Sequence, residues 1–387
     1  MKRRIRRIPL ILLCLLLSLL SFCITVSGDG TQPSVGEEMP DEYFGFLDGI
    51  SEDIRALLPP SLFEKDTQDI GEGVRQMSDF SYLLKTLLSL IGLCIGDCAK
   101  VLATIAGLLV LSSICRALRS SFGQESVGKA FSLCSTLVIM LGLLKQSGEI
   151  LERTVSYFDS LSRMTSASLP LMGVLYAMGG NVGAAAASSA GLSVFMTVLE
   201  SFVNKSILPF CGFCMALSLV SAVDPSMRLG SLSATWKKNY TTALAFLMML
   251  LLAMLGAQTT LAARADTLAM RSAKFAAGNL IPVVGGSVSE LLRSVSAGVS
   301  YLRGTAGICG VLVLLLTLLP TLVELLLFRL AWQLSASLAD MLGCDSEKKM
   351  LDEFSSLIGF LIAAVAICSS VLLLSMTLLA HCASAIG

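Results

Sequence analysis

Long apolar stretches separated by polar segments make up most of the chain after residue 80. About 20 apolar residues are enough for a helix to cross the hydrocarbon core of a bilayer. Stretches of this kind lie near residues 90–115, 130–145, 169–187, 192–223, 241–263, 307–330 and 357–379. The fourth is long enough for two helices with a break around residues 204–209. The pattern predicts an all-α, polytopic membrane helix bundle over residues 82–387.

Two segments between the spans, 149–163 and 264–274, are polar and amphipathic. A helix of this kind buries one face and leaves the other in water. We expect both segments to lie at the bilayer interface or on the surface of the bundle.

The two halves of the membrane domain share one order of features. In each, a span is followed by a polar amphipathic stretch, a Pro/Gly break, a stretch of small residues and a Pro-containing span. A shift of about 112 residues aligns identical residues: Pro170 with Pro282, Gly173 with Gly285 and, at one residue less, Pro209 with Pro320. We predict two repeat units at 129–223 and 238–334, followed by the final span at 357–379.

The Pro/Gly breaks are candidates for a transport pathway. Proline removes a backbone donor, and glycine lets backbones approach closely. Polar backbone freed at membrane depth must be buried in protein or line a wet cavity, so paired broken helices are typical of transport pathways. The candidates are Pro170, Gly173, Gly179, Gly183, Asn279, Pro282, Gly285 and Gly286. The alternative is that both breaks are tight turns at the membrane surface.

Small residues recur every four positions after the first break, at Gly179, Gly183, Ala187 and Gly191. Such a stripe allows two helices to pack closely. The contact can lie within one chain or between the copies of a homo-oligomer.

Four charged residues lie within or beside predicted spans, where a charge is costly unless it is paired or hydrated. Asp97 and Lys100 are three residues apart on one helix face and can neutralise each other. Glu200 has Asn204 one turn further on, and Glu324 is five residues from Arg329. These charges are either structural ion pairs or carboxylates that line a pathway, and Glu200 and Glu324 are the better candidates for the second role.

The N-terminus has the pattern of an exported protein. Residues 1–7 hold five basic side chains and no acid, an apolar run follows to residue 24, and small residues precede position 28. We predict a signal peptide at 1–28. The alternatives are an uncleaved first helix and a lipoprotein signal at Cys23, which the bulky Phe22 disfavours. Because basic residues stay in the cytoplasm, the following segment is expected to be extracytoplasmic in each case.

The segment at 29–81 is acidic, with thirteen acidic and three basic residues up to Phe80. It is too short and too poor in apolar residues for a large core of its own. We expect a small extracytoplasmic segment that packs on the membrane or on a partner.

Composition excludes several classes of function. Of the 387 residues, 55% are hydrophobic and only 14% charged, whereas a soluble domain carries about 25% charge. The basic surface outside the bilayer that nucleic acid requires is missing. His381 is the single histidine, so histidine-based metal sites and Ser-His-Asp triads are excluded. The chain also contains no phosphate-binding loop of the kind that ATPases use.

The twelve cysteines avoid the acidic segment that faces the oxidising side, which argues against a disulfide framework. Cys211 and Cys214 have the spacing of a thioredoxin-type redox pair. They lie inside an apolar run rather than between a strand and a soluble helix, so packing is the favoured role.

The direction of the second repeat stays open. Arg116, Arg119 and Lys129 place the first loop of the membrane domain in the cytoplasm. The segments 228–238 and 264–274 are both basic and flank one span, so only one of them can obey the same rule. The repeats are therefore either inverted or parallel.

One segment gives the chain a family resemblance: Lys274-Phe-Ala-Ala-Gly-Asn-Leu-Ile-Pro-Val-Val-Gly-Gly-Ser-Val-Ser-Glu290. Together with the exported N-terminus, the acidic segment and the multiple spans, it resembles stage III sporulation protein AE of endospore-forming Firmicutes. The resemblance extends over nearly the whole chain, and residues 278–286 are its most specific part.

The resemblance implies a subunit of the channel-like complex that joins mother cell and forespore. The protein would lie in the mother-cell membrane around the forespore, with its acidic segment in the intermembrane space. Partners would be other stage III sporulation proteins, including a separate ATPase subunit, and the complex would support late forespore development and gene expression. The family carries no catalytic residue, metal or cofactor over to this chain.

Two other functions remain as alternatives. One is an autonomous secondary transporter with a substrate site between the two repeats. The other is an intramembrane enzyme that uses Cys211 and Cys214. Dependence on partner subunits separates the sporulation complex from the first alternative, and retention of function in a double Cys→Ala variant would exclude the second.

Overall fold

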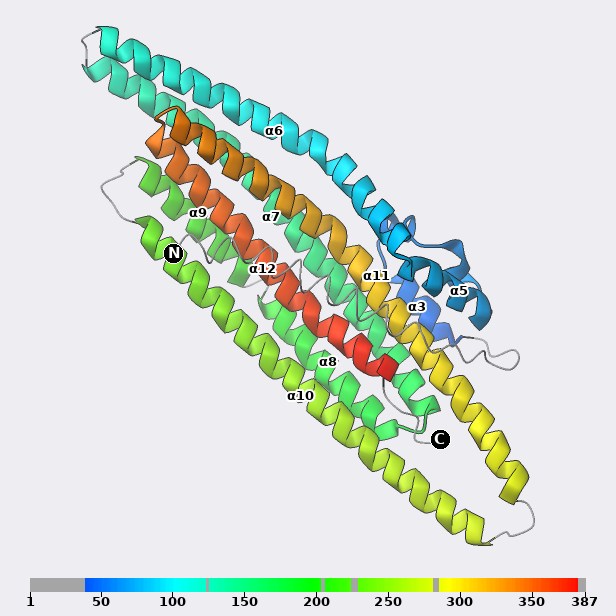
Figure 1. Cartoon of the computed structure of the whole chain (residues 1–387). Helices are drawn as coiled ribbons and strands as arrows, with labels where there is room; N and C mark the ends of the chain where they lie inside the picture. The colour runs from blue at the N-terminus through cyan, green and yellow to red at the C-terminus, as the bar shows by residue number, and fades with distance from the viewer. Residues whose placement is uncertain (1–38, 123–124, 203–205, 224–228, 281–284, 382–387) are drawn as a thin grey trace.

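The computed structural model describes residues 39–122, 125–202, 206–223, 229–280 and 285–381, and every regular element in these ranges is a helix (Figure 1). This confirms the predicted all-α fold class. The predicted signal peptide lies outside the described residues.

Seven long helices form the bundle. They are α6 (Phe80–Phe122), α7 (Glu125–Met178), α8 (Val182–Phe202), α9 (Leu208–Val223), α10 (Leu229–Leu280), α11 (Gly285–Met341) and α12 (Asp345–His381). The 57 residues of α11 make a helix about 85 Å long, far longer than the ~30 Å hydrocarbon core of a bilayer. Within the described residues, α6, α10, α11 and α12 each contain a stretch long and apolar enough to cross a membrane.

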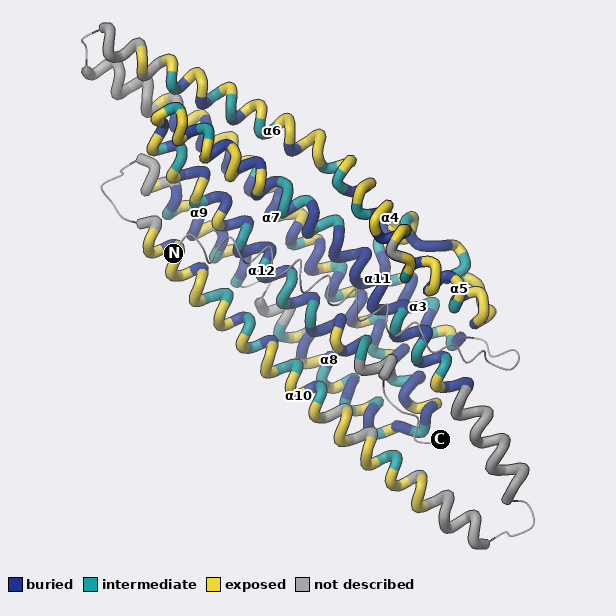
Figure 2. The backbone as a smooth tube through the Cα atoms, in the orientation of Figure 1, coloured by how far each residue is buried: buried dark blue, intermediate teal, exposed yellow. Residues whose placement is uncertain are grey.

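Helices α11 and α12 form the centre of the bundle, and α6 and α10 lie on its outside (Figure 2). The central pair is mostly buried within the protein. By contrast, α6 exposes Leu88, Leu93 and Leu111, and α10 exposes Phe246 and Met249. Exposed apolar side chains on outer helices are compatible with lipid contact.

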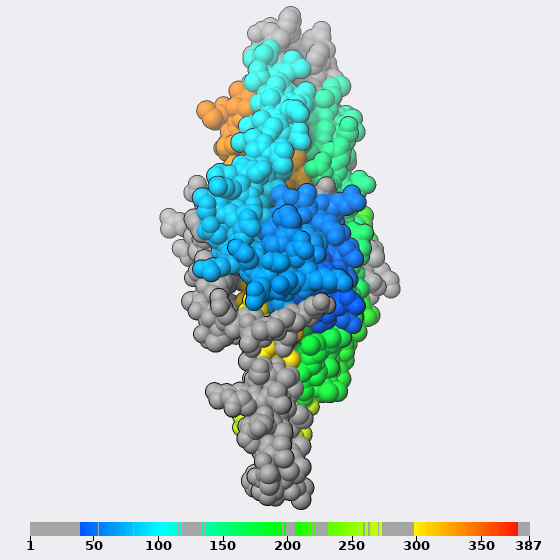
Figure 3. All heavy atoms as spheres, turned by 90° about the vertical axis from the view of Figure 1, so that its right-hand side faces the viewer, coloured from blue at the N-terminus to red at the C-terminus, as the bar shows by residue number. Residues whose placement is uncertain are grey.

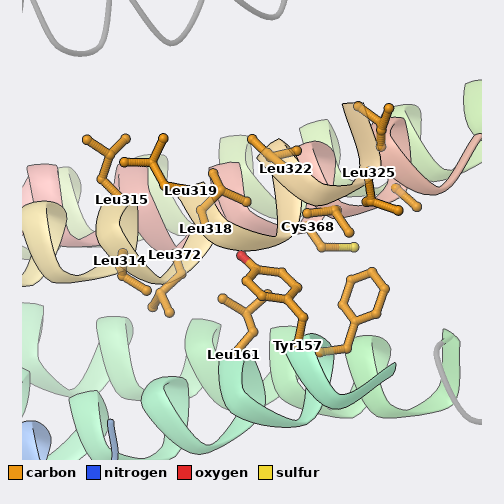
Figure 4. Packing of buried hydrophobic residues seen from close by; sticks show 14 of the residues in the cluster. Tyr157, Leu161, Leu314, Leu315, Leu318, Leu319, Leu322, Leu325, Cys368 and Leu372 are labelled. Carbon is orange, nitrogen blue, oxygen red and sulfur yellow. The ribbon is translucent and has the colours of Figure 1, made fainter. Parts of the chain in front are cut away.

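The core at mid-height is built from α7, α11 and α12 (Figure 4). Tyr157 of α7 reaches between the leucines of α11 and Cys368 of α12, and its hydroxyl forms a 2.6 Å hydrogen bond with Ser369 Oγ. The buried leucines include Leu161, Leu314, Leu318, Leu322, Leu325 and Leu372. A polar phenol is accommodated here because its hydroxyl has a partner.

The helices run alternately along the long axis of the molecule (Figure 1). Helices α7, α10 and α12 run one way, and α6, α8, α9 and α11 run the other. At one end, which we call the three-connection end, lie the links α6–α7, α9–α10 and α11–α12. At the other, the two-connection end, lie the links α7–α8 and α10–α11. The two sequence stretches matched as repeats thus have their helices in the same order and the same direction.

The α10–α11 hairpin extends beyond the other helices at the two-connection end (Figure 1). Gly183 at the start of α8 lies level with Asp266 of α10 because the two residues are in close contact. From there α10 continues to Leu280 before the chain returns.

The amphipathic segment 149–163 exposes one face on the surface of the bundle, which is one of the two places expected for it. Both it and the segment 264–274 continue without interruption in α7 and α10 and do not separate two spans. Pro170 also lies inside α7 and does not break it. The predicted break in the fourth span is confirmed, since α8 ends at Phe202 and Pro209 lies in the first turn of α9, where a missing N–H removes no helix bond.

The described part of the acidic segment folds into short helices that pack on α7, α11 and the start of α6 (Figure 3). They are α3 (Asp41–Asp48), α4 (Glu52–Arg55), the 3₁₀ helix η1 (Pro60–Phe63) and α5 (Thr67–Ser78). The side chain of Asp66 caps α5 by accepting a 3.0 Å hydrogen bond from the N–H of Gln68. The apolar side chains of this segment are buried against the bundle.

Tyr43 anchors this segment. It is fully buried, and its Oη lies 3.3 Å from Cys309 Sγ of α11. Burial raises the pKa of Tyr43, so the phenol stays neutral. The segment therefore takes its core from the bundle of the same chain, and not from the membrane or a partner as its composition led us to expect.

Candidate functional site

The first predicted break is the turn between α7 and α8. Gly180 has a φ of 74°, a conformation that glycine adopts without steric cost. The N–H of Asn181 donates to Tyr176 O at 2.9 Å, which closes the turn. Asn181 is buried, whereas Pro170 lies on the exposed side of α7. Gly173 has open space where a side chain would be.

Gly179 and Gly183 allow two charged side chains to approach the turn. A Cβ on Gly179 would lie 3.0 Å from Cζ of Arg303, a buried residue of α11. A Cβ on Gly183 would lie 3.0 Å from Oδ1 of Asp266. The other carboxylate oxygen of Asp266 accepts a 3.1 Å hydrogen bond from the N–H of Ala184. A side chain of α10 thus caps the N-terminus of α8, where a negative charge is favourable.

The second predicted break is the link between α10 and α11. Asn279 lies in the last turn of α10, and Gly285 and Gly286 begin α11. Pro282 lies outside the described residues, and so do the surroundings of the other three. Both breaks therefore connect two helices at the two-connection end. This arrangement agrees with the alternative interpretation of the breaks as turns, and not with breaks inside a membrane-spanning helix. Their role in transport stays a prediction.

The sequence predicts the partners of the candidate intramembrane charges only in part. Lys100 Nζ lies 3.0 Å from Asp97 Oδ1, and both side chains are exposed. Glu324 of α11 pairs with Arg153 of α7 and not with Arg329. The Arg329 guanidinium lies over Gly359 of α12 instead. The surroundings of Glu200, which lies in α8, are outside the described residues.

A further ion pair joins α10 to α12. Lys237 Nζ lies 3.0 Å from Glu353 Oε2, and their side chains are only 6% and 20% exposed. Ser233 donates a 3.2 Å hydrogen bond to the same oxygen. This pair could not be predicted from the sequence, because the partners are 116 positions apart and no local spacing relates them.

A buried carboxylate ties three helices together near the three-connection end. Oε1 of Glu347, on α12, accepts hydrogen bonds from Ser112 of α6 at 3.0 Å and from Thr136 of α7 at 3.3 Å. Glu347 is fully buried. Its place in the first turn of α12 also favours a negative charge.

Cys211 and Cys214 are buried in α9 and not bonded to each other. The eight cysteines whose side chains the structure describes are all free. In the same part of the chain, no group of three or more His, Cys, Asp and Glu side chains is placed to hold a metal ion.

The stripe of small residues on α8 faces α10 within the same chain. Gly183 contacts Asp266, and Gly191 contacts Leu255, both of α10. The described residues therefore use this stripe for internal packing, the first of the two alternatives for it.

Replacing Gly191 with leucine tests this packing. An added Cβ would overlap with Cδ1 of the buried Leu255, so we expect a loss of about 1–3 kcal/mol in the free energy of unfolding. SDS denaturation of the purified protein in mixed micelles measures it. Combining the change with Leu255→Ala should restore part of the loss. Gly212→Leu is the matched control, because nothing lies within 4 Å of its added Cβ; equal losses in both variants would contradict the packing role.

Comparison with known proteins gives one family. The family model of stage III sporulation protein AE matches residues 63–383. Stage III sporulation protein AE of Bacillus subtilis (strain 168) is 27% identical over 304 residues, which cover 78% of this chain and 73% of that protein. No solved structure matches the chain. Because the family model extends from the end of η1 through α12, the chain belongs to the stage III sporulation protein AE family.

Proposed function

We propose that the chain is a non-enzymatic integral membrane subunit of the channel complex that links mother cell and forespore. The observation that carries the proposal is the family match, which includes all seven helices of the bundle. Four of these helices contain stretches able to cross a membrane. In this role the protein is required for late forespore development and gene expression.

Charge supports an orientation in which the three-connection end faces the mother-cell cytoplasm. Arg116, Arg119 and Lys129 flank the α6–α7 link at this end, and the basic residues 228–238 follow the α9–α10 link at the same end. Positive residues are retained in the cytoplasm. The segment α3–α5 precedes α6, so in this orientation it lies on the intermembrane side.

The partners in this proposal are the other stage III sporulation proteins of the complex, with a separate ATPase subunit among them. The chain has no phosphate-binding loop, so nucleotide hydrolysis is assigned to that subunit. The lipid bilayer is the second partner, and nucleic acid is not one.

An in-frame deletion of the gene in its own organism tests the proposal. We expect engulfment to finish and the forespore then to shrink, with its late genes silent. Microscopy of forespore size and a late forespore reporter gene measure the two effects, and an intact copy at another locus is the control. Normal spores in the deletion strain would contradict the proposal. Solute transport by the purified protein alone in liposomes would favour an autonomous transporter instead.

A further inference from the structure

One exposed face of α7 is polar along the part of the helix that packs beside the apolar stretches of α11 and α12. Every exposed residue of α7 between positions 145 and 166 is charged, a serine or a glycine. We call this surface the polar stripe of α7; its charged members are Lys145, Glu149, Glu152, Arg153, Asp159 and Arg163. On the same helix, the exposed residues before the stripe include Leu137, Val138 and Leu141.

Contacts with the two central helices, α11 and α12, determine the height of the stripe, by which we mean its position along the long axis of the bundle. The hydrogen bond between Tyr157 and Ser369 joins residues 212 positions apart, and α7 and α12 run in the same direction (Figure 1). At that offset, the apolar residues 357–379 of α12 lie beside residues 145–167 of α7. The stripe is about 32 Å long at 1.5 Å per residue, close to the ~30 Å thickness of the hydrocarbon core.

Contacts with α11 give the same height. Trp332 Nε1 donates to Gln146 Oε1 at 3.4 Å, and Arg153 pairs with Glu324. Both α11 residues border or lie within its apolar stretch. The exposed pair Asp97 and Lys100 adds charge from α6, which packs against both α7 and α11.

Lipid cannot cover this surface at low cost, because charged groups at membrane depth need a partner or water. Among the described residues, Glu149, Glu152 and Asp159 form no ion pair. The segment α3–α5 packs beside the stripe, with Gly49 close to Ala167, but leaves Arg163 exposed. Figure 3 shows this segment next to α6 on one side of the molecule, with α7 along the edge.

We propose that a second copy of this chain covers the polar stripe, and that the stripes of neighbouring copies enclose a water-filled path through the bilayer. The stripe holds three basic and three acidic side chains. A neighbouring copy therefore supplies charges of both signs, and water between the copies hydrates those left without a partner. The inference concerns how α7 is covered in a membrane and does not depend on the sporulation role.

The outer face of α10 provides a control at the same height. Lys237 and Glu353 are 116 positions apart and in contact, and α10 and α12 run in the same direction. Leu250 of α10 therefore lies level with residue 366 of α12, and Ser156 of α7 lies level with residue 368. Both are exposed, but Leu250 belongs to an apolar face.

Photo-cross-linking of the full chain tests for the second copy. Benzoylphenylalanine is introduced at Ser156 or at Leu250, and the protein is produced in bacterial membranes without other sporulation proteins. We expect illumination to give a covalent dimer from the Ser156 position and none from the Leu250 position. Absence of the dimer at Ser156, or cross-linking there only to a different protein, would overturn the proposal even if the deletion strain fails to sporulate.

Thiol labelling tests for water. In a chain whose twelve native cysteines are replaced by alanine or serine, we expect Ser156→Cys to react with a charged, membrane-impermeant methanethiosulfonate at least about tenfold faster than Leu250→Cys, since only the first faces water. Equally slow labelling of both would overturn the water-filled path. Fast labelling at Ser156 without the photo-cross-linked dimer would show that water reaches the stripe within one copy and would overturn the role of the second.

Discussion

Replacing Glu353 with alanine is expected to lower the free energy of unfolding by about 3–5 kcal/mol, because it leaves a buried lysine without its partner. The Lys237 side chain is only 6% exposed, and its ammonium lies 3.0 Å from Glu353. In the wild type this contact and the hydrogen bond from Ser233 hold α10 against α12. SDS denaturation in mixed micelles, followed by circular dichroism, measures the change.

Two controls separate the buried charge from a general effect of substitution. The double variant Lys237→Met with Glu353→Leu removes both charges and should return to within about 1 kcal/mol of the wild type. Asp48→Ala removes an ion pair with Arg55 at the surface, where the side chain of Asp48 is 68% exposed and that of Arg55 is 45% exposed. This change should lower the free energy of unfolding by less than about 1 kcal/mol. A double variant as unstable as Glu353→Ala would show that the buried charge is not the cause.

Trp332→Ala is expected to destabilise the protein by a similar amount, about 3–5 kcal/mol. Trp332 is fully buried, lies edge-on to Phe354 at a centroid distance of 5.9 Å, and donates to Gln146. Its removal leaves a cavity where α7, α11 and α12 meet, and the lost dispersion contacts have no replacement. The midpoint of SDS unfolding should shift to a lower SDS fraction.

The other tryptophan of the chain is the natural control. Trp236 of α10 is 52% exposed and contacts Phe213 edge-on at 6.2 Å. Trp236→Ala removes a side chain of the same size without creating an internal cavity, so we expect a loss below about 1 kcal/mol. Similar losses in both variants would mean that the centre of the bundle does not depend on Trp332.

The fold class could be predicted from the sequence because its apolar stretches are longer than those of helices in soluble proteins and long enough to cross a bilayer. The sequence also predicted the break between α8 and α9, where Pro209 lies in a first helical turn. It divided α7 and α10 wrongly. Hydropathy reports the preference of each side chain for lipid or water, whereas a helix continues as long as its backbone hydrogen bonds do, and polar residues such as Glu149 and Arg163 support those bonds well.

The candidate site was predicted less completely. Local spacing was enough for Asp97 and Lys100, since three residues place two side chains on one helix face. It misassigned Glu324, whose partner Arg153 is 171 residues away. The interactions of Glu347 and Glu353 were missed for the same reason. Which side chains meet across a bundle depends on the rotation and register of each helix, and a single sequence does not specify these.

The direction of the two halves is a further result that depends on the structure. Residues 229–238 of the first basic segment begin α10 at the three-connection end, and residues 264–274 lie toward its other end. Since α7 and α10 run in the same direction, the two predicted repeats are parallel and not inverted.

The length of the α10–α11 hairpin determines how far the protein reaches out of the membrane. Beyond Asp266, which marks the level of the α7–α8 turn, α10 continues for 14 residues to Leu280, or about 20 Å. Lipid head groups occupy only about 5–8 Å on each side of the hydrocarbon core. With the bilayer placed as inferred above, the last turns of α10 therefore stand clear of the head groups.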